Sequence, residues 1–140
     1  MQYELDPTDI AILRLLQSNA RLQWREIGEQ VHLTGQAVGV RIRRLEELGA
    51  IRGYTVLTDE AKLGKPITAI VTILMKTNLH AEFQRFLREE ETVREAHRIS
   101  GDGCYSLKAL AADNDELNRL LDRILEFANY RVQLSIQQVK

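Results

Sequence analysis

The chain has 140 residues, of which 44% are hydrophobic and 28% charged, with one cysteine and 19 Lys and Arg against 20 Asp and Glu. This composition excludes an intrinsically disordered protein, an internal disulfide and a zinc site built from clustered Cys and His residues. A net charge of -1 also excludes a uniformly basic nucleic-acid-binding protein, so a DNA-binding surface would have to be local.

No part of the sequence is typical of a membrane or secretion segment. The longest apolar run, residues 69–75, is much shorter than a bilayer span, and residues 1–4 lack the basic start of a signal peptide. We therefore expect a cytoplasmic protein without a membrane segment, and we expect neither a metal nor a cofactor.

The first fifty residues predict three short helices joined by turns. Asp6 is a capping residue followed by a proline at the first helical position, so the first helix begins there and extends to about Ser18. The second helix begins at Trp24. The third begins after Thr34, a good N-cap, and ends at Gly49. Three helices with such short turns form a compact unit.

Two side chains of this unit need a separate interpretation. Asp9, in the first helix, is expected to face water together with Arg14 and Gln17. Trp24 could stack on a nucleic-acid base, but we expect it to pack in the small helical core.

After Gly49 the pattern changes from helical to extended. Residues 51–57 are rich in β-branched and aromatic side chains and predict a hairpin or a single strand. Residues 59–63 are expected to form one helical turn. The cluster of Gly64, Lys65 and Pro66 then marks the boundary of the next domain.

From residue 67 onward the predicted elements follow the order strand, helix, strand, strand, helix, strand. The strands are expected at residues 67–76, 93–100, 105–111 and 132–137, with helices after Asn78 and from Asp113 to Ala128. This βαββαβ order is the ferredoxin-like split pattern, whose helices cover only one face of the sheet. The other face, which includes Ile70 and Leu74, therefore needs a partner, and a second copy of the chain is the simplest one.

The third helix carries the first candidate functional surface. Between Thr34 and Leu45 it has three arginines and no acid, and these polar positions lie opposite its apolar ones. A third helix of this kind after a short turn is what a helix-turn-helix DNA reader requires; the alternative is an ordinary solvated helix face. The candidate DNA-binding residues are Arg21, Gln23, Arg25, Thr34, Gln36, Ala37, Val40, Arg41, Arg43 and Arg44. Gln36, Ala37 and Val40 are expected to face bases, and the arginines mostly phosphates.

The segment between the second and third predicted strands is the other candidate site. Its tentative effector-binding residues are Gly101, Asp102, Gly103, Cys104 and Ser106. A turn with two glycines and an acid can offer backbone amides and a carboxylate to an amino acid. The alternative is a purely structural hairpin turn, for which Asp-Gly is a strong signal. Cys104 itself is expected to be a half-buried, inert thiol.

Several strings of the sequence, above all Arg41-Ile42-Arg43-Arg44-Leu45-Glu46 followed by Leu48-Gly49-Ala50-Ile51, resemble the Lrp/AsnC family of bacterial and archaeal transcription regulators. The resemblance covers essentially the whole chain. It implies an α+β fold with an N-terminal winged helix-turn-helix at residues 1–50, a wing and linking strand at 51–65, and a ferredoxin-like βαββαβ dimerisation and possible effector-binding domain at 66–140. It also implies double-stranded DNA as a partner, a homodimer that assembles into a tetramer or octamer, and a possible amino-acid effector at the Gly-Asp turn.

Two positions depart from the pattern of that family. Thr34-Gly35-Gln36 stands where its recognition helix often begins Ser-Pro-Thr, so the base preference does not transfer. Cys104 stands where many amino-acid-responsive members have a second acid, and a thiol is a weak partner for an ammonium group. We therefore expect at most a weak response to amino acids.

The sequence thus predicts a DNA-binding transcriptional regulator without catalytic activity. Two other classes remain as alternatives. A stand-alone ligand-sensing module would leave the N-terminal unit dispensable. An enzyme similar to the tetrapyrrole decarboxylases that resemble this family would need His or Arg side chains in its C-terminal cavity, for which His97 and Arg98 are the candidates.

Overall fold

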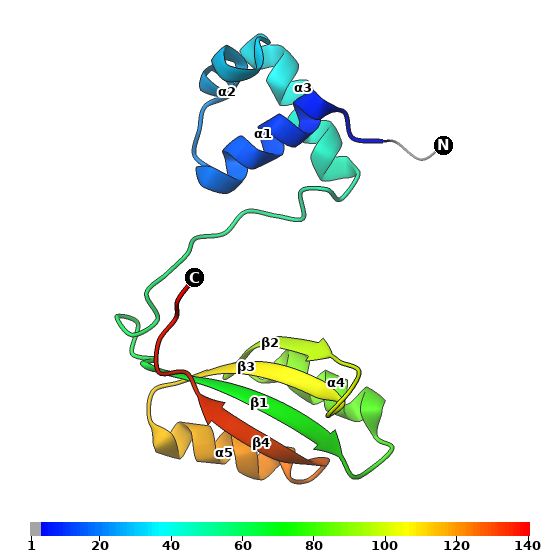
Figure 1. Ribbon diagram of the computed structural model, residues 1–140, viewed down its shortest axis with the longest axis vertical. Coiled ribbons are helices and arrows are strands. Elements are labelled where there is room, and N and C mark those ends of the chain that lie inside the picture. Colours follow the sequence, from blue (N-terminus) through cyan, green and yellow to red (C-terminus); the bar gives the residue numbers. More distant parts are fainter. Residues whose placement is uncertain (1–3) are drawn as a thin grey trace. The chain divides into compact units, whose positions relative to one another are not determined.

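The computed structural model describes residues 4–140, which divide into two compact units, a first that ends at Leu57 and a second, Thr58–Lys140 (Figure 1). Each unit has its own cluster of buried apolar side chains. Within the described residues, none of the helices combines the length and the apolar composition that a membrane span requires.

The first unit consists of α1 (Pro7–Ser18), α2 (Trp24–Val31) and α3 (Gly35–Glu47), as the sequence predicts. The start of α1 is fixed by Asp6, whose side chain accepts a hydrogen bond from the backbone N–H of Asp9 at 2.8 Å. The start of α3 is fixed in the same way by Thr34, whose hydroxyl accepts from the Ala37 N–H at 3.1 Å. Such caps contribute about 1 kcal/mol each, because they satisfy N–H groups that have no partner inside the helix.

The core of this unit is small and draws on all three helices. It contains Ile12 from α1, Ile27 from α2, and Val38, Ile42 and Leu45 from α3, all exposed by 3% or less. Full burial of such a side chain contributes about 1.5–3 kcal/mol. The spacing of the three α3 residues leaves the opposite side of that helix in solvent.

The strand expected at residues 51–57 does not form among the described residues of this single chain. A strand exists only where a neighbouring strand accepts and donates its backbone hydrogen bonds, and the one sheet formed by residues 4–140 does not include this segment. Val56 and Leu57 are 79% and 99% exposed. Residues 59–64 do form the expected turn, with the Lys62 N–H donating to the Asp59 carbonyl at 3.0 Å.

The second unit has the predicted βαββαβ order. Its elements are β1 (Ile67–Met75), α4 (His80–Glu89), β2 (Val93–Arg98), β3 (Tyr105–Ala111), α5 (Asn114–Ile124) and β4 (Ala128–Leu134). The strands form one antiparallel sheet in the order β2-β3-β1-β4 (Figure 1). The ferredoxin-like arrangement expected from the sequence is therefore confirmed.

One face of this sheet is covered and the other is open. Ala69, Val71 and Ile73 of β1 are fully buried in a cluster with side chains of α4 and α5. Ile70, which points to the opposite face because side chains alternate along a strand, is 37% exposed. The covered face thus holds the core, and the open face keeps apolar surface in solvent.

The last strand begins four residues and ends three residues earlier than expected. Ala128, which the sequence pattern placed in the helix, is buried and pairs with Met75 at the end of β1. The pairing ends at Leu134 opposite Ala69, and Ile136 is fully exposed. The cause is a tight turn in which the Phe127 N–H donates to the Ile124 carbonyl at 2.9 Å, so the chain reverses directly after α5.

Candidate DNA-binding site and ligand-binding turn

Glycines set the close approach of α2 to α3. A Cβ atom at Gly28 would lie 2.3 Å from the carbonyl oxygen of Leu33, and a Cβ atom at Gly39 would lie 2.4 Å from the ring of Trp24. The turn between the helices passes through His32, which adopts a left-handed conformation with φ 60°. These contacts give two helices joined by a short turn, with α3 held against the start of α2.

Trp24 was expected to pack in the small helical core, but it lies outside the buried cluster. It rests on the backbone of α3 at Gly39 and remains 42% exposed. The guanidinium carbon of Arg43 lies 5.4 Å from the centre of its ring, a cation–π contact worth about 0.5–1 kcal/mol at an exposed site. Trp24 therefore orients an α3 arginine at the surface.

The solvent side of α3 presents four of the predicted DNA-binding residues together. Gln36, Val40, Arg43 and Arg44 follow one another at helical spacing and are all exposed, with Val40 58% exposed. Thr34 caps the same helix and is exposed, whereas Ala37 is half-buried. The structure thus places polar, basic and small apolar groups on one accessible helix face.

The remaining basic candidates lie at the start of α2. Arg21, Gln23 and Arg25 are all exposed, and Gln23 is the N-cap residue of α2. Arg25 forms an ion pair with Glu29 one helical turn later at 3.6 Å, which contributes little because both side chains are in solvent. These side chains are accessible beside the N-terminus of a helix, where backbone N–H groups attract anions.

Arg41 has a different environment from the other arginines of α3. Its Nη1 donates to Oδ2 of Asp6 at 2.7 Å and to Oδ1 of Asp9 at 2.9 Å. The hydrogen bond from Arg41 lowers the pKa of the Asp6 carboxyl, and the two carboxylates raise the pKa of Arg41. The guanidinium that was expected to face phosphate therefore joins α3 to the start of α1.

The expectation that Asp9 faces water is wrong. Asp9 is 1% exposed, and its second carboxylate oxygen accepts a hydrogen bond from the Asp6 N–H at 3.1 Å. Burial of a carboxylate is tolerated only where it is paired and hydrogen-bonded, and Arg41 supplies that partner. The sequence pattern missed the contact because Asp9 and Arg41 are separated by 32 residues.

The Gly-Asp turn uses two of its own amides internally. The Gly103 N–H donates to the Gly101 carbonyl at 3.0 Å, and the Cys104 N–H donates to the Ile73 carbonyl at 2.7 Å. These two amides are therefore engaged within the chain, which corrects part of the expectation that the turn offers its amides to a ligand. Asp102 is exposed, and Cys104 is half-buried against the core as expected.

The remaining residues of this site have fixed positions as well. Ser106 is half-buried on β3, opposite Thr72 of β1. Gly103 has φ 124°, and a Cβ atom there would lie 2.7 Å from the side chain of Thr72, so only glycine fits. Among residues 4–140, no group of three or more His, Cys, Asp or Glu side chains is arranged to hold a metal ion.

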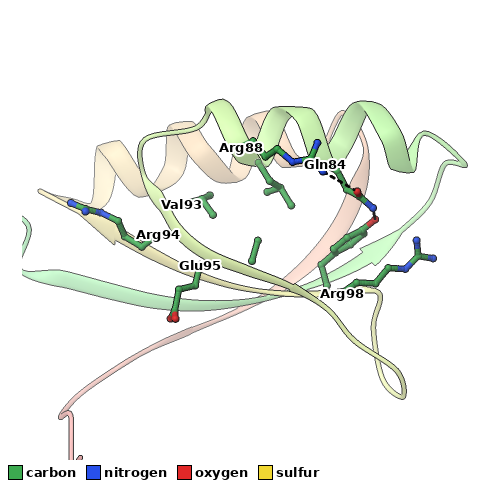
Figure 2. A pocket seen from close by; sticks show the side chains of 9 residues that line it. Gln84, Arg88, Val93, Arg94, Glu95 and Arg98 are labelled. Atoms are coloured by element: carbon green, nitrogen blue, oxygen red, sulfur yellow. Dashed lines mark hydrogen bonds between the residues drawn. The ribbon is translucent and has the colours of Figure 1, made fainter. Parts of the chain in front are cut away.

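A cleft of about 420 Å³ that the sequence did not predict lies between α4 and β2 (Figure 2). Arg98 lines this cleft, whereas His97 does not. Adjacent residues of a strand point to opposite faces of the sheet, so these two side chains do not converge on one site as the enzyme alternative would require.

Comparison with known proteins identifies the two units. A family model described as an AsnC-type helix-turn-helix domain matches residues 5–46, and one described as an Lrp/AsnC ligand binding domain matches residues 68–140. The chain belongs to the Lrp/AsnC family of transcriptional regulators. The expected family and fold class are thereby confirmed.

Individual relatives agree along nearly the whole chain. The HTH-type transcriptional regulator LrpB of Bacillus subtilis is 44% identical over 137 residues, which cover 98% of this chain and 92% of LrpB. Among solved structures, LrpC of B. subtilis matches with a TM-score of 0.92 at 28% identity and covers 99% of both chains. NMB0573 of Neisseria meningitidis, solved as a complex with L-Met, matches with a TM-score of 0.90 at 26% identity and covers 98% of this chain and 93% of that one.

These matches decide between the three classes considered from the sequence. The relatives are named as transcriptional regulators, and they share both the helix-turn-helix unit and the ligand-binding unit. The chain is thus a DNA-binding transcriptional regulator and not an enzyme, and its N-terminal unit is part of the conserved architecture of its relatives rather than an addition to a sensing module.

Proposed function

We propose that this regulator reads double-stranded DNA with the exposed face of α3. The observation that carries the proposal is that Gln36, Val40, Arg43 and Arg44 share an accessible side of a helix whose other side forms the core. In this arrangement Gln36 and Val40, with Ala37, face the base edges in the major groove. Arg43 and Arg44 neutralise phosphates, because they extend from the later turns of the helix.

The start of α2 supplies further phosphate contacts in this proposal. Arg21, Gln23 and Arg25 are exposed around the N-terminus of α2, where charge and backbone N–H groups both favour an anion. Thr34 acts through its cap, which fixes the N-terminus of α3. Arg41 acts by positioning α3, because its guanidinium is held by Asp6 and Asp9.

The protein acts in the cytoplasm as a homodimer formed through the open face of the sheet, and dimers assemble into a tetramer or octamer. Ile70 is 37% exposed and Leu74 is half-buried on this face, so a second copy would remove apolar surface from water. A C2 dimer is the commonest symmetric assembly. Sedimentation of the full chain should show Ile70→Lys shifted towards monomer, while Leu79→Lys, at the start of α4, sediments like the wild type.

The C-terminal unit receives a small-molecule effector at the turn formed by Gly101, Asp102 and Gly103. Support comes from NMB0573, a relative in fold that was solved with L-Met. Cys104 supplies no charge for the ammonium group of an amino acid, so amino acids bind weakly here. Calorimetric titration of the full chain with the twenty amino acids tests this, and a micromolar Kd for any of them would contradict it.

The DNA part is tested by the salt dependence of binding to a genomic fragment selected with the purified protein. Each lost phosphate contact reduces the slope of log K against log salt by about one unit. Arg43→Ala and Arg44→Ala should both show this reduction, whereas Arg41→Met should weaken binding with an unchanged slope. Arg85→Ala, in α4, is the matched control and should leave both quantities unchanged. Unchanged slopes for Arg43→Ala and Arg44→Ala would show that α3 does not face the DNA.

A further inference from the structure

The cleft between α4 and β2 is separate from the Gly-Asp turn and has its own set of lining residues. Its volume of about 420 Å³ falls within the range of about 300–1,000 Å³ that is typical of small-molecule sites. Leu87, Val93 and Ala96 are its apolar lining residues and are called its apolar floor here. Figure 2 shows Val93 between α4 and β2. The floor therefore suits an aliphatic group rather than a fully hydrated ion.

The rim of this cleft is positively charged. Arg88 from α4 and Arg98 from β2 border it, and neither takes part in an ion pair found among residues 4–140. Arg94 also borders the cleft, but its Nη2 lies 3.4 Å from Oε2 of Glu60. Nη2 of Arg88 lies 3.5 Å from Oε1 of Gln84, which is a neutral partner. The charges of both guanidinium groups thus remain for an anion, and their planar donor pairs match the geometry of a carboxylate.

One end of the cleft is held rigidly by Tyr105. This side chain is 2% exposed, and its hydroxyl accepts a hydrogen bond from Nε2 of Gln84 at 3.1 Å. Nδ1 of His80 lies 2.8 Å from the same hydroxyl. The guanidinium carbon of Arg98 lies 5.7 Å from the centre of the Tyr105 ring, so the aromatic face supports this arginine before any ligand arrives.

No carboxylate faces the cleft to receive a cationic group. Glu95 is the one acid among its lining residues, and Figure 2 shows the carboxylate of Glu95 on the side of β2 away from α4. An ammonium group inside the cleft would therefore meet arginines and find no partner. This separates the cleft from a typical amino-acid site.

We propose that this cleft binds a small organic anion, namely a carboxylate on an aliphatic body without an amino group. Arg88 and Arg98 hold the carboxylate, and Leu87, Val93 and Ala96 contact the aliphatic part. The proposal adds a second site to the turn named in the proposed function and rests on that function only in taking the C-terminal unit as the ligand-sensing part of a regulator.

The test uses calorimetric titration of the full chain with 4-methylpentanoate, with leucine and with inorganic phosphate. 4-Methylpentanoate and leucine share a carboxylate and a branched body and differ by the amino group. We expect 4-methylpentanoate to bind at least tenfold more tightly than either of the other two. Equal affinity for leucine would contradict the claim that the cleft has no partner for an ammonium group. Equal affinity for phosphate would contradict the claim that the apolar floor contributes to binding.

Variants locate the binding and separate it from the DNA-binding function. Arg88→Gln and Arg98→Gln should each weaken 4-methylpentanoate at least tenfold, while Arg85→Gln on the same helix as Arg88 binds it like the wild type. Undiminished binding by both cleft variants, or no binding of 4-methylpentanoate by the wild type at millimolar concentration, would overturn the proposal. DNA binding is measured on the same samples. If the wild-type protein bound 4-methylpentanoate but not DNA, the result would contradict the proposed DNA interface on α3 and leave the proposal for the cleft intact.

Discussion

Replacing Arg41 by Met should destabilise the helix-turn-helix unit although the residue lies on the helix proposed to face DNA. The substitution keeps much of the aliphatic stem but leaves Asp9, which is 1% exposed, without its cationic partner. Removing one partner of a fully buried ion pair costs about 3–5 kcal/mol, whereas an exposed pair contributes about 0–1 kcal/mol. The Arg41 side chain is 31% exposed and that of Asp9 2% exposed, so we expect a loss of about 2 kcal/mol.

A loss of this size is large for the unit concerned. A domain of this length has a free energy of unfolding of about 3–9 kcal/mol, and a change of 2 kcal/mol lowers its Tm by about 8–16 °C. Trp24 is the only tryptophan of the chain and belongs to this unit, so its fluorescence reports the unfolding of α1 to α3 separately from the sheet. Thermal and urea unfolding followed by this signal provide the measurement.

A double-mutant cycle shows whether the loss comes from the ion pair. Asp9→Ala should also destabilise the unit, but Arg41→Met together with Asp9→Ala should cost less than the sum of the two, because the buried carboxylate that loses Arg41 is then absent. Arg14→Met, on an exposed part of α1, is the control and should stay within about 0.5 kcal/mol of the wild type. Strict additivity, or a loss for Arg41→Met no larger than that of the control, would refute the reasoning.

Three further predictions concern other parts of the chain. Gly39→Ala should displace Trp24, because the new Cβ would lie 2.4 Å from its ring; we expect a loss of about 1–3 kcal/mol and a red-shifted emission, and unchanged emission would contradict the close packing. Glu116→Gln should lower the Tm of the second unit at neutral pH. Lys65 lowers the pKa of the Glu116 carboxyl, so its stabilisation is complete above the ordinary pKa of 4.5 and disappears as the pH falls through the lowered value. The difference between the two proteins should therefore vanish in acid, and a difference independent of pH would exclude the Lys65 contact as its cause. Cys104→Asp should strengthen leucine binding, because it adds a charge for the ammonium group; calorimetry showing no gain would remove the turn as the amino-acid site.

Much of the fold could be predicted from local patterns. The beginnings of α1 and α3 follow from the capping residues Asp6 and Thr34, whose hydrogen bonds depend on residues three positions away. The βαββαβ order follows from alternating and helical apolar spacing in the same way. Local sequence carries these features because the interactions that fix them are themselves local.

The errors arise where an interaction joins distant parts of the chain. Phe127 and Ala128 continue the apolar spacing of α5, and only the pairing of Ala128 with Met75 shows that a strand has begun. The Arg41 contacts with Asp6 and Asp9 connect helices 32 to 35 residues apart, so a single sequence shows three surface-type charges and no pairing. The extended composition of residues 51–57 predicts a strand, but a strand also requires a neighbour that local composition does not reveal.

The turn and the cleft offer opposite charges to an effector. At the turn, Cys104 is half-buried, and Asp102 is the one acidic residue of the segment 101–106. At the cleft, Arg88 and Arg98 supply positive charge, and the acid among the lining residues points to the other side of the strand. An amino acid would lose part of its ammonium contacts at the first position and meet repulsion at the second. A carboxylate without an amino group pairs with the two arginines of the cleft, whereas at the turn it would face the like charge of Asp102. The charge distribution of this unit therefore favours such an anion over the corresponding amino acid at the cleft and not at the turn.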